Sequence, residues 1–222
     1  MRLYLASNDL GNFAEVLVDL VGGNKNVLMI SNARDHRSAD DRKAIVDEDA
    51  KMLSDCGFSV TELDLRKFFG RSGHLRKYID DFAPGLVFAM GGNLYSLATA
   101  LRLSGMDEII QMDLASDKHV YGGYSAGSMV AARDLMNYAY SFGQQSGDRL
   151  EQAEELYGEL STDGLGLIGE YIIPHADEDK FKLACKEAEA SISRKGLTPI
   201  VLNNTDVVVL RDEKIRVFKS NS

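Results

Sequence analysis

Residues 119–132 read HVYGGYSAGSMVAA. It contains the pattern Gly-x-Ser-x-Gly, in which Ser125 stands between two glycines. The pattern is typical of a nucleophilic serine on a sharp turn between a strand and a helix, where only small neighbours fit. We therefore expect a buried strand at Val120–Gly123 and a helix from Ala126, whose free N–H groups and positive dipole end would lie beside the serine.

The segments on either side alternate between strand-like and helix-like patterns, which indicates an α/β fold with a mostly parallel sheet covered on both faces. Further strands are expected at Leu3–Ala6, Val27–Ser31, Ser59–Leu63, Leu86–Met90, Tyr171–Ile173 and Ile200–Leu202, with a closing hairpin of Asp206–Leu210 and Lys214–Phe218. Helices are expected at Ala39–Cys56, over an apolar stripe at 94–101, at Arg149–Leu156 and at Asp179–Lys195. The polar stretch 137–162 predicts an excursion over the active-site edge. No linker or repeat interrupts the pattern, so residues 1–222 are expected to form one domain.

Composition and charge exclude several classes of function. The net charge of −9 argues against a nucleic-acid partner, because phosphates select a basic surface. No apolar run approaches the roughly 18 residues of a membrane-spanning helix. The first residues lack the apolar core of a signal peptide, so we expect a cytoplasmic protein without membrane contact. Cys56 and Cys185 are too few for a disulfide framework, and no cluster of residues suggests a metal or another cofactor.

A second glycine-rich turn follows the expected strand Leu86–Met90. Gly91 and Gly92 leave the backbone bare at the carboxyl end of that strand, where ligands collect in open parallel sheets. A backbone N–H there could stabilise an oxyanion. The same glycines also suit a plain turn that caps the helix beginning at Leu94, and both roles use the same N–H groups.

His175 is the histidine best placed to act as a base for Ser125. It follows the apolar strand Tyr171–Ile173, and Pro174 fixes the backbone just before it. A lone histidine is more often structural than catalytic, but the presence of the serine turn elsewhere in the chain favours a catalytic role for His175. The pairing predicts a serine hydrolase.

The order of Gly91-Gly92-Asn93, then Gly-Tyr-Ser-Ala-Gly, then Pro174-His175 resembles the serine peptidase family of dipeptidase E (α-aspartyl dipeptidase) and cyanophycinase. The similarity covers nearly the whole chain. It implies a three-layer α/β sandwich like that of class I glutamine amidotransferases, with serine where those enzymes carry cysteine. It further implies a peptidase of short peptides and a homodimer. Carried over by position, Ser125 would be the nucleophile, His175 the base, and the N–H groups of Gly92 and Ala126 the oxyanion hole.

The third member of the catalytic triad is where the chain departs from that family. The dipeptidase E type has an aspartate some fifteen residues after the serine, whereas residues 137–141 here contain no acid. An acid in this role must contact the second nitrogen of the imidazole. Glu178 and Asp179 are the favoured candidates, and Asp177 and Asp134 remain open. As the alternative, the acids after His175 are only dipole partners at the start of the next helix.

Specificity and two competing functions stay open at this stage. An aspartyl preference needs a cation for the substrate carboxylate, and Arg133 and Arg149 are the candidates. One competing function is an α/β-hydrolase-type esterase, which shares the serine turn but usually has its histidine nearer the end of the chain. The other is a non-catalytic member of the fold that binds a ligand only.

Overall fold

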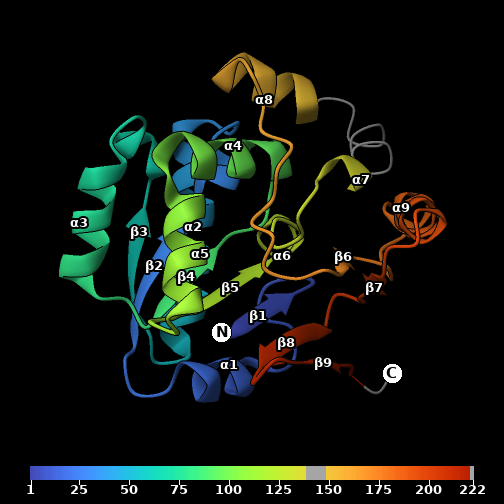
Figure 1. The fold of residues 1–222 in the computed structure, drawn as a ribbon, viewed down its shortest axis with the longest axis horizontal. Helices are drawn as coiled ribbons and strands as arrows, with labels where there is room; N and C mark the ends of the chain where they lie inside the picture. Colours follow the sequence, from blue (N-terminus) through green and yellow to red (C-terminus); the bar gives the residue numbers. More distant parts are fainter. Residues whose placement is uncertain (139–148, 221–222) are drawn as a thin grey trace.

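The computed structural model describes residues 1–138 and 149–220, and a seven-stranded sheet forms their centre (Figure 1). The strands lie in the order β3-β2-β4-β5-β1-β8-β9. Their bounds are β1 Leu3–Ala6, β2 Asn26–Ile30, β3 Ser59–Leu63, β4 Leu86–Ala89, β5 Val120–Tyr124, β8 Val207–Arg211 and β9 Lys214–Phe218. From β3 to β1 each strand is parallel to its neighbour, whereas β8 runs antiparallel to β1 and forms a hairpin with β9.

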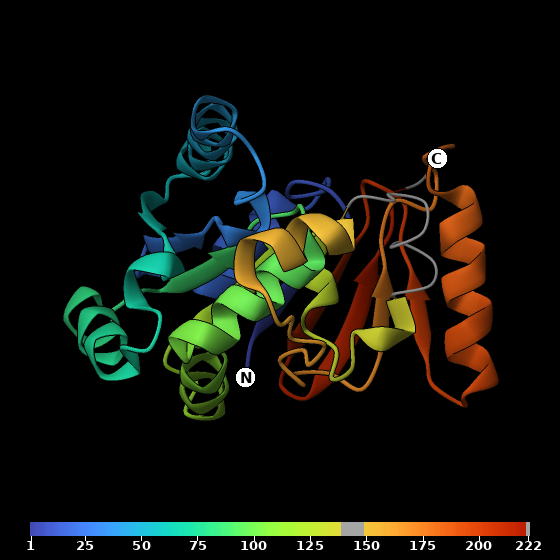
Figure 2. The ribbon, with the colours of Figure 1, turned by 90° about the horizontal axis from the view of Figure 1, so that it is seen from above.

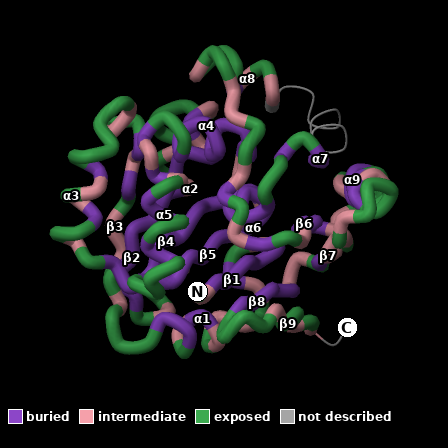
Figure 3. Tube along the Cα trace, in the orientation of Figure 1, coloured by how far each residue is buried: buried purple, intermediate pink, exposed green. Residues whose placement is uncertain are grey.

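Alternate side chains of each strand enter two separate apolar cores, one on each face of the sheet. In β1, Leu3 and Leu5 join one core, while Tyr4 and Ala6 join the other. This follows from the period of two along a strand, and it explains why the central strands are apolar at every position. Figure 3 shows the strands β1, β4 and β5 buried along their length, with many exposed residues on the outer helices. The sheet is thus the middle layer of a sandwich.

Helices cover both faces of the sheet (Figures 1 and 2). One face is covered by α1 (Ala14–Val21) and α2 (Ala39–Asp55). The other is covered by α3 (Ser72–Phe82), α4 (Leu94–Ser104), α5 (Met106–Ala115) and the short α6 (Ala126–Met129). Two 3-10 turns, η1 (Asn32–Arg34) and η2 (Leu65–Phe68), follow β2 and β3. Beyond α4 lies α8 (Arg149–Tyr157), and α7 (Met136–Tyr138) is a single turn.

A second, smaller sheet lies beside the first. It consists of β6 (Tyr171–Ile173) and β7 (Pro199–Val201), which run parallel and are connected by α9 (Lys182–Arg194). The inner face of α9 buries Cys185, Ala188 and Ile192 against the same core as α4. The small sheet matters for the site because His175 follows directly after β6.

The predicted fold class is confirmed, and the predicted strands are all present with ends shifted by one residue at most. Sequence analysis did not predict the helices α1, α3 and α5. In α3 only Leu75 and Ile79 are buried, and two residues make too weak a stripe to show in the sequence. Of the expected excursion over 137–162, residues 139–148 lie outside the described part of the chain. Among the described residues, no helix is both long and apolar enough to cross a membrane.

Candidate active site

Ser125 occupies the sharp turn between β5 and α6. Its backbone has φ 50° and ψ −113°, a left-handed conformation that a residue with a side chain adopts only at a cost of about 1–3 kcal/mol. Hydrogen bonds to the end of β1 hold the turn in place. The backbone N–H of Ser125 is shared between the carbonyl oxygens of Ala6 (3.2 Å) and Ser7 (3.1 Å). These contacts anchor the serine to the carboxyl end of β1, and the strained turn projects its hydroxyl away from the strand.

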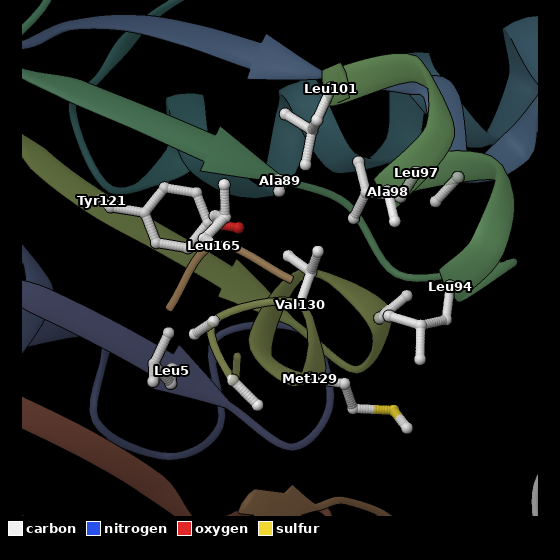
Figure 4. Close-up of a cluster of buried hydrophobic side chains, with 14 of the residues drawn as sticks. Leu5, Ala89, Leu94, Leu97, Ala98, Leu101, Tyr121, Met129, Val130 and Leu165 are labelled. Atoms are coloured by element: carbon white, nitrogen blue, oxygen red, sulfur yellow. The ribbon is translucent and has the colours of Figure 1, made fainter. Parts of the chain in front are cut away.

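Gly127 is required because the serine turn packs tightly against β4. A Cβ at this position would lie 2.1 Å from the carbonyl oxygen of Ala89, which no side chain tolerates. The short helix α6 packs against α4, and Val130, directly after α6, belongs to the same apolar cluster as Leu94 and Leu97 (Figure 4). The small residue therefore allows the helix start to approach the sheet, which is what the sequence pattern predicts.

The glycine turn after β4 lies next to the serine. A Cβ on Gly91 would come within 3.1 Å of the Ser125 Cβ, and Gly92 has φ 146°, which favours glycine. The N–H groups of Gly92 and of Ala126, the first residue of α6, donate to no protein acceptor within residues 1–138 and 149–220. Two backbone donors on either side of a hydroxyl are the arrangement that stabilises a developing oxyanion.

His175 reaches the serine from the small sheet. Its backbone has φ 63°, and its N–H donates to the Ser7 hydroxyl at 2.8 Å, which ties the end of β6 to the end of β1. The ring nitrogen Nε2 lies 2.9 Å from Ser125 Oγ, within the distance of a hydrogen bond. The structure therefore brings together the two residues that the sequence predicted as nucleophile and base, 50 positions apart in the chain.

Two side chains meet the other ring nitrogen of His175. The Asn204 Oδ1 lies 2.7 Å from Nδ1, and the Glu178 Oε1 lies 3.2 Å from it. The same Glu178 oxygen accepts a hydrogen bond from Asn204 Nδ2 at 3.1 Å, and its other oxygen pairs with Lys180 at 2.7 Å. Partial burial by itself raises the pKa of Glu178, but hydrogen bonds from Lys180 and Asn204 and the nearby His175 bring that pKa below its ordinary value. The carboxylate is thus ionised at neutral pH.

The other predicted acids lie elsewhere. Asp179 points into solvent with its side chain 92% exposed, and it pairs with Lys182. Asp177 accepts a hydrogen bond from the backbone N–H of Asn204 at 2.9 Å. Asp134 accepts from the backbone N–H of Met136 at 2.8 Å. Of the acids proposed from the sequence, Glu178 is the one whose carboxylate is brought to the ring.

A cavity of about 200 Å³ opens over the serine and histidine. Arg34, Tyr124, Tyr138 and Lys180 line it together with the glycine turn. Arg34 follows β2 in the turn η1, and its Nη2 donates to the Tyr124 hydroxyl at 3.3 Å. Its Nε is buried without a hydrogen-bond partner among the described residues. Of the predicted arginines, Arg133 is exposed and does not line the cavity, and the side chain of Arg149 lies outside what the structure describes.

Four residues of this site were not predicted from the sequence, namely Ser7, Arg34, Lys180 and Asn204. A signal existed for two of them, because Ser7 and Arg34 come shortly after β1 and β2, and ligands collect at the carboxyl ends of parallel strands. Asn204 follows β7, which pairs only with β6, so its approach to His175 required the position of the small sheet. In the described part of the chain, no group of three or more His, Cys, Asp or Glu side chains is arranged to hold a metal ion.

The chain is similar in sequence to known peptidases. The sequence profile of peptidase family S51 matches residues 4–218. An uncharacterized peptidase of Listeria innocua is 30% identical over 172 residues, which cover 77% of this chain and 74% of that protein. An uncharacterized peptidase of Listeria monocytogenes is 28% identical over 173 residues, which cover 77% of this chain and 76% of that protein.

Solved structures give the same fold. The crystal structure of a candidate peptidase E protein from Listeria monocytogenes superposes with a TM-score of 0.77 at 19% identity, covering 99% of this chain and 98% of that one. A peptidase from an acI-B1 actinobacterium gives a TM-score of 0.70 at 19% identity, covering 99% of this chain and 87% of that one. The family match and the shared fold exclude the competing function proposed above, an α/β-hydrolase-type esterase. The chain belongs to peptidase family S51, the family of dipeptidase E, and is a serine-type peptidase.

Proposed function

We propose that the protein hydrolyses very short peptides through a covalent acyl-enzyme on Ser125, with His175 as general base. The observation that carries this proposal is the 2.9 Å approach of His175 Nε2 to Ser125 Oγ at a residue held in a strained, left-handed conformation. A serine hydroxyl is a weak nucleophile by itself and needs a base within hydrogen-bond distance to take its proton.

The reaction follows from the positions of the groups. Ser125 Oγ forms a bond to the peptide carbonyl carbon while its proton passes to His175 Nε2. The oxyanion that develops is stabilised by the N–H groups of Gly92 and Ala126, and losing one such donor would be expected to raise the barrier by about 3–4 kcal/mol. The imidazolium then gives the proton to the leaving amine, and water repeats the cycle on the acyl-enzyme. The Glu178 carboxylate, 3.2 Å from Nδ1, supplies the negative charge that stabilises the imidazolium.

The cavity supports a dipeptide-sized substrate with an acidic side chain. Its volume of about 200 Å³ is below the about 300–1,000 Å³ of pockets that hold drug-sized ligands. Arg34 offers a guanidinium in its wall, and no carboxylate of the described residues lies within ion-pair distance of that group. A planar guanidinium matches a carboxylate with two parallel hydrogen bonds. We therefore propose an aspartyl preference in which Arg34 binds the substrate carboxylate.

The first prediction concerns Ser125→Ala. The wild type should release aspartate from Asp-Leu, and the variant should not, because no acyl-enzyme can form. Release would be measured with both proteins in parallel, together with labelling of the wild type by a fluorophosphonate. Labelling without aspartate release would retain the serine nucleophile and discard the substrate. If the wild type neither releases aspartate nor takes the label, the protein is a non-catalytic member of its family.

The second prediction concerns Arg34→Gln. The kcat/KM for Asp-Leu should fall by about 10- to 100-fold, the value of a hydrogen bond to a charged group, while kcat/KM for the uncharged Asn-Leu changes little. Arg37→Gln is the matched control, because Arg37 belongs to the same loop but is exposed and does not line the cavity. An equal loss on both substrates would show that Arg34 supports the fold of the site and does not select the side chain.

A further inference from the structure

We propose that Asn204 is the residue that directly holds the imidazole of His175, and that Glu178 orients the side-chain amide of Asn204 while its charge stabilises the imidazolium through space. The arrangement is a serine, a histidine, an asparagine and then a carboxylate. Both Asn204 and Glu178 are positioning residues, since neither touches the reacting atoms. This inference rests on Ser125 and His175 acting as proposed above.

The orientation of the Asn204 amide is fixed by its carboxylate neighbour. An ionised carboxylate can only accept hydrogen bonds, so the atom of Asn204 that lies 3.1 Å from Glu178 Oε1 must be the NH₂ group. The amide oxygen is then the atom that faces His175, at 2.7 Å from Nδ1. A flip of the amide would bring its oxygen against the carboxylate, where neither atom can donate, and would remove the hydrogen bond to Glu178.

The amide orientation in turn fixes the tautomer of His175. Because the Asn204 oxygen only accepts, Nδ1 must carry the hydrogen, and the neutral ring then presents a lone pair at Nε2. That lone pair faces Ser125 Oγ at 2.9 Å, ready to take its proton. When it does so, the Nδ1 proton stays on nitrogen, because a neutral amide cannot accept it.

Glu178 has both oxygens committed to other partners. Oε1 accepts from Asn204, and Oε2 pairs with Lys180 at 2.7 Å. The 3.2 Å between Oε1 and His175 Nδ1 is longer than the 2.7 Å to the Asn204 oxygen. The carboxylate thus orients Asn204 and stabilises the imidazolium through space. Among the residues that the structure describes, Lys180 lines the same cavity as the ring, and Asp9, from the loop after β1, interacts electrostatically with His175.

The backbone of Asn204 is held by the loop after β6 that also carries Glu178. Its N–H donates to Asp177 Oδ1 at 2.9 Å, so residues 177 and 178 bind the main chain and the side chain of Asn204 respectively. These hydrogen bonds connect the loop after β7 to the loop after β6. Replacing the side chain of Asn204 leaves the backbone contact in place, which makes the side chain testable by itself.

The test measures the rate at which a fluorophosphonate labels Ser125 as a function of pH, which does not depend on peptide specificity. In that reaction the Oγ–phosphorus bond forms, fluoride leaves and the serine proton passes to His175. The variants are Asn204→Ala, Asn204→Asp and Glu178→Gln. Asn203→Ala is the matched control, because Asn203 is the adjacent asparagine and is exposed. The melting temperature of each variant is measured alongside.

Asn204→Ala should label about 10²- to 10⁴-fold more slowly than the wild type, because the ring loses the partner that selects its tautomer. Glu178→Gln should stay within about tenfold of the wild type, since a glutamine oxygen can still accept from Asn204. Asn204→Asp should recover part of the rate lost in the alanine variant, because the new carboxyl group shares one proton with Glu178 and its other oxygen still accepts from Nδ1. Its acid limb should also shift to higher pH, because a carboxylate at this position raises the pKa of His175.

The proposal is overturned if Glu178→Gln is slowed as much as Asn204→Ala or more, because the carboxylate would then hold the ring directly. Labelling of Asn204→Ala at the wild-type rate would overturn it as well. If Asn204→Ala does not fold, Asn204→Asp decides, and an unshifted acid limb contradicts the proposal. A wild type that takes no label contradicts the proposed function itself, and the two failures are therefore distinguishable.

Discussion

Tyr124 illustrates how single residues connect the candidate site to the opposite face of the sheet. It is the last residue of β5 and directly precedes Ser125, and its hydroxyl donates to Asp49 of α2 at 2.6 Å. The same hydroxyl accepts from Arg34, which lines the cavity. Asp49 is thereby held in the apolar core between α2 and the sheet. Burial raises its pKa to about 6, although the Tyr124 hydrogen bond and Arg34 lower it.

The third prediction is a pH dependence of stability that comes from Asp49. Its pKa is about 6 in the folded protein against an ordinary value of 3.8, so between these pH values only the folded state keeps the proton. The stabilising contribution is complete below the ordinary pKa and is lost as pH rises through about 6. At pH 8 the buried charge then costs on the order of 3 kcal/mol.

Asp49→Asn removes this pH dependence, because the amide stays neutral and still accepts from Tyr124. The free energy of unfolding in urea should therefore be higher for Asp49→Asn than for the wild type by about 3 kcal/mol at pH 8, and this difference should shrink to about 1 kcal/mol at pH 4.5. A difference that is the same at both pH values would show that Asp49 does not change its charge in this range.

At the scale of elements, α4 depends on the residue that follows the glycine turn. Asn93 is its N-cap and is fully buried, and its side-chain oxygen accepts hydrogen bonds from the N–H groups of Tyr95 (3.0 Å) and Ser96 (3.1 Å). These contacts satisfy two of the donors that the start of a helix leaves open. The same residue donates its backbone N–H to Ala33 and so fixes the loop that carries Gly92.

The fourth prediction is that Asn93→Ala destabilises the protein by about 1–2 kcal/mol, the usual cost of losing an N-cap. The labelling rate of Ser125 should also fall, because Gly92 is the adjacent residue. Ser38→Ala is the comparison, since Ser38 is the exposed N-cap of α2 and lies outside the cavity lining. It should lower stability without changing the labelling rate. If the two variants label Ser125 at the same rate, the N-cap of α4 does not influence the position of Gly92, and this prediction is wrong.

At the scale of the whole molecule, the site forms where two sheets meet. The large sheet contributes the turns after β1, β4 and β5, whose ends lie together because Ala6 pairs with Tyr124 and Ala89 with Gly123. The small sheet contributes His175 after β6 and Asn204 after β7. The Ser7 hydroxyl joins the two sheets by accepting from the backbone of His175. The proposed nucleophile, Ser125, and its proposed base, His175, therefore come from different sheets.

The sequence by itself determined the strands, the serine turn and the pairing of Ser125 with His175. Each of these follows from local physics, namely the period of apolar residues, the small residues that a tight turn needs, and the common edge at which parallel strands end. The helices with few buried residues were not visible in this way.

Only the tertiary structure decided which side chains surround His175 and that Arg34 and Lys180 line the cavity. Glu178, Asp177 and Asp179 are consecutive in sequence, and nothing local distinguishes them. Their roles depend on the loop after β7, which brings Asn204 to the ring. Arg34 likewise enters the cavity because the turn after β2 lies beside Tyr124. Such contacts join residues far apart in the chain, and the packing of the two sheets sets their distances.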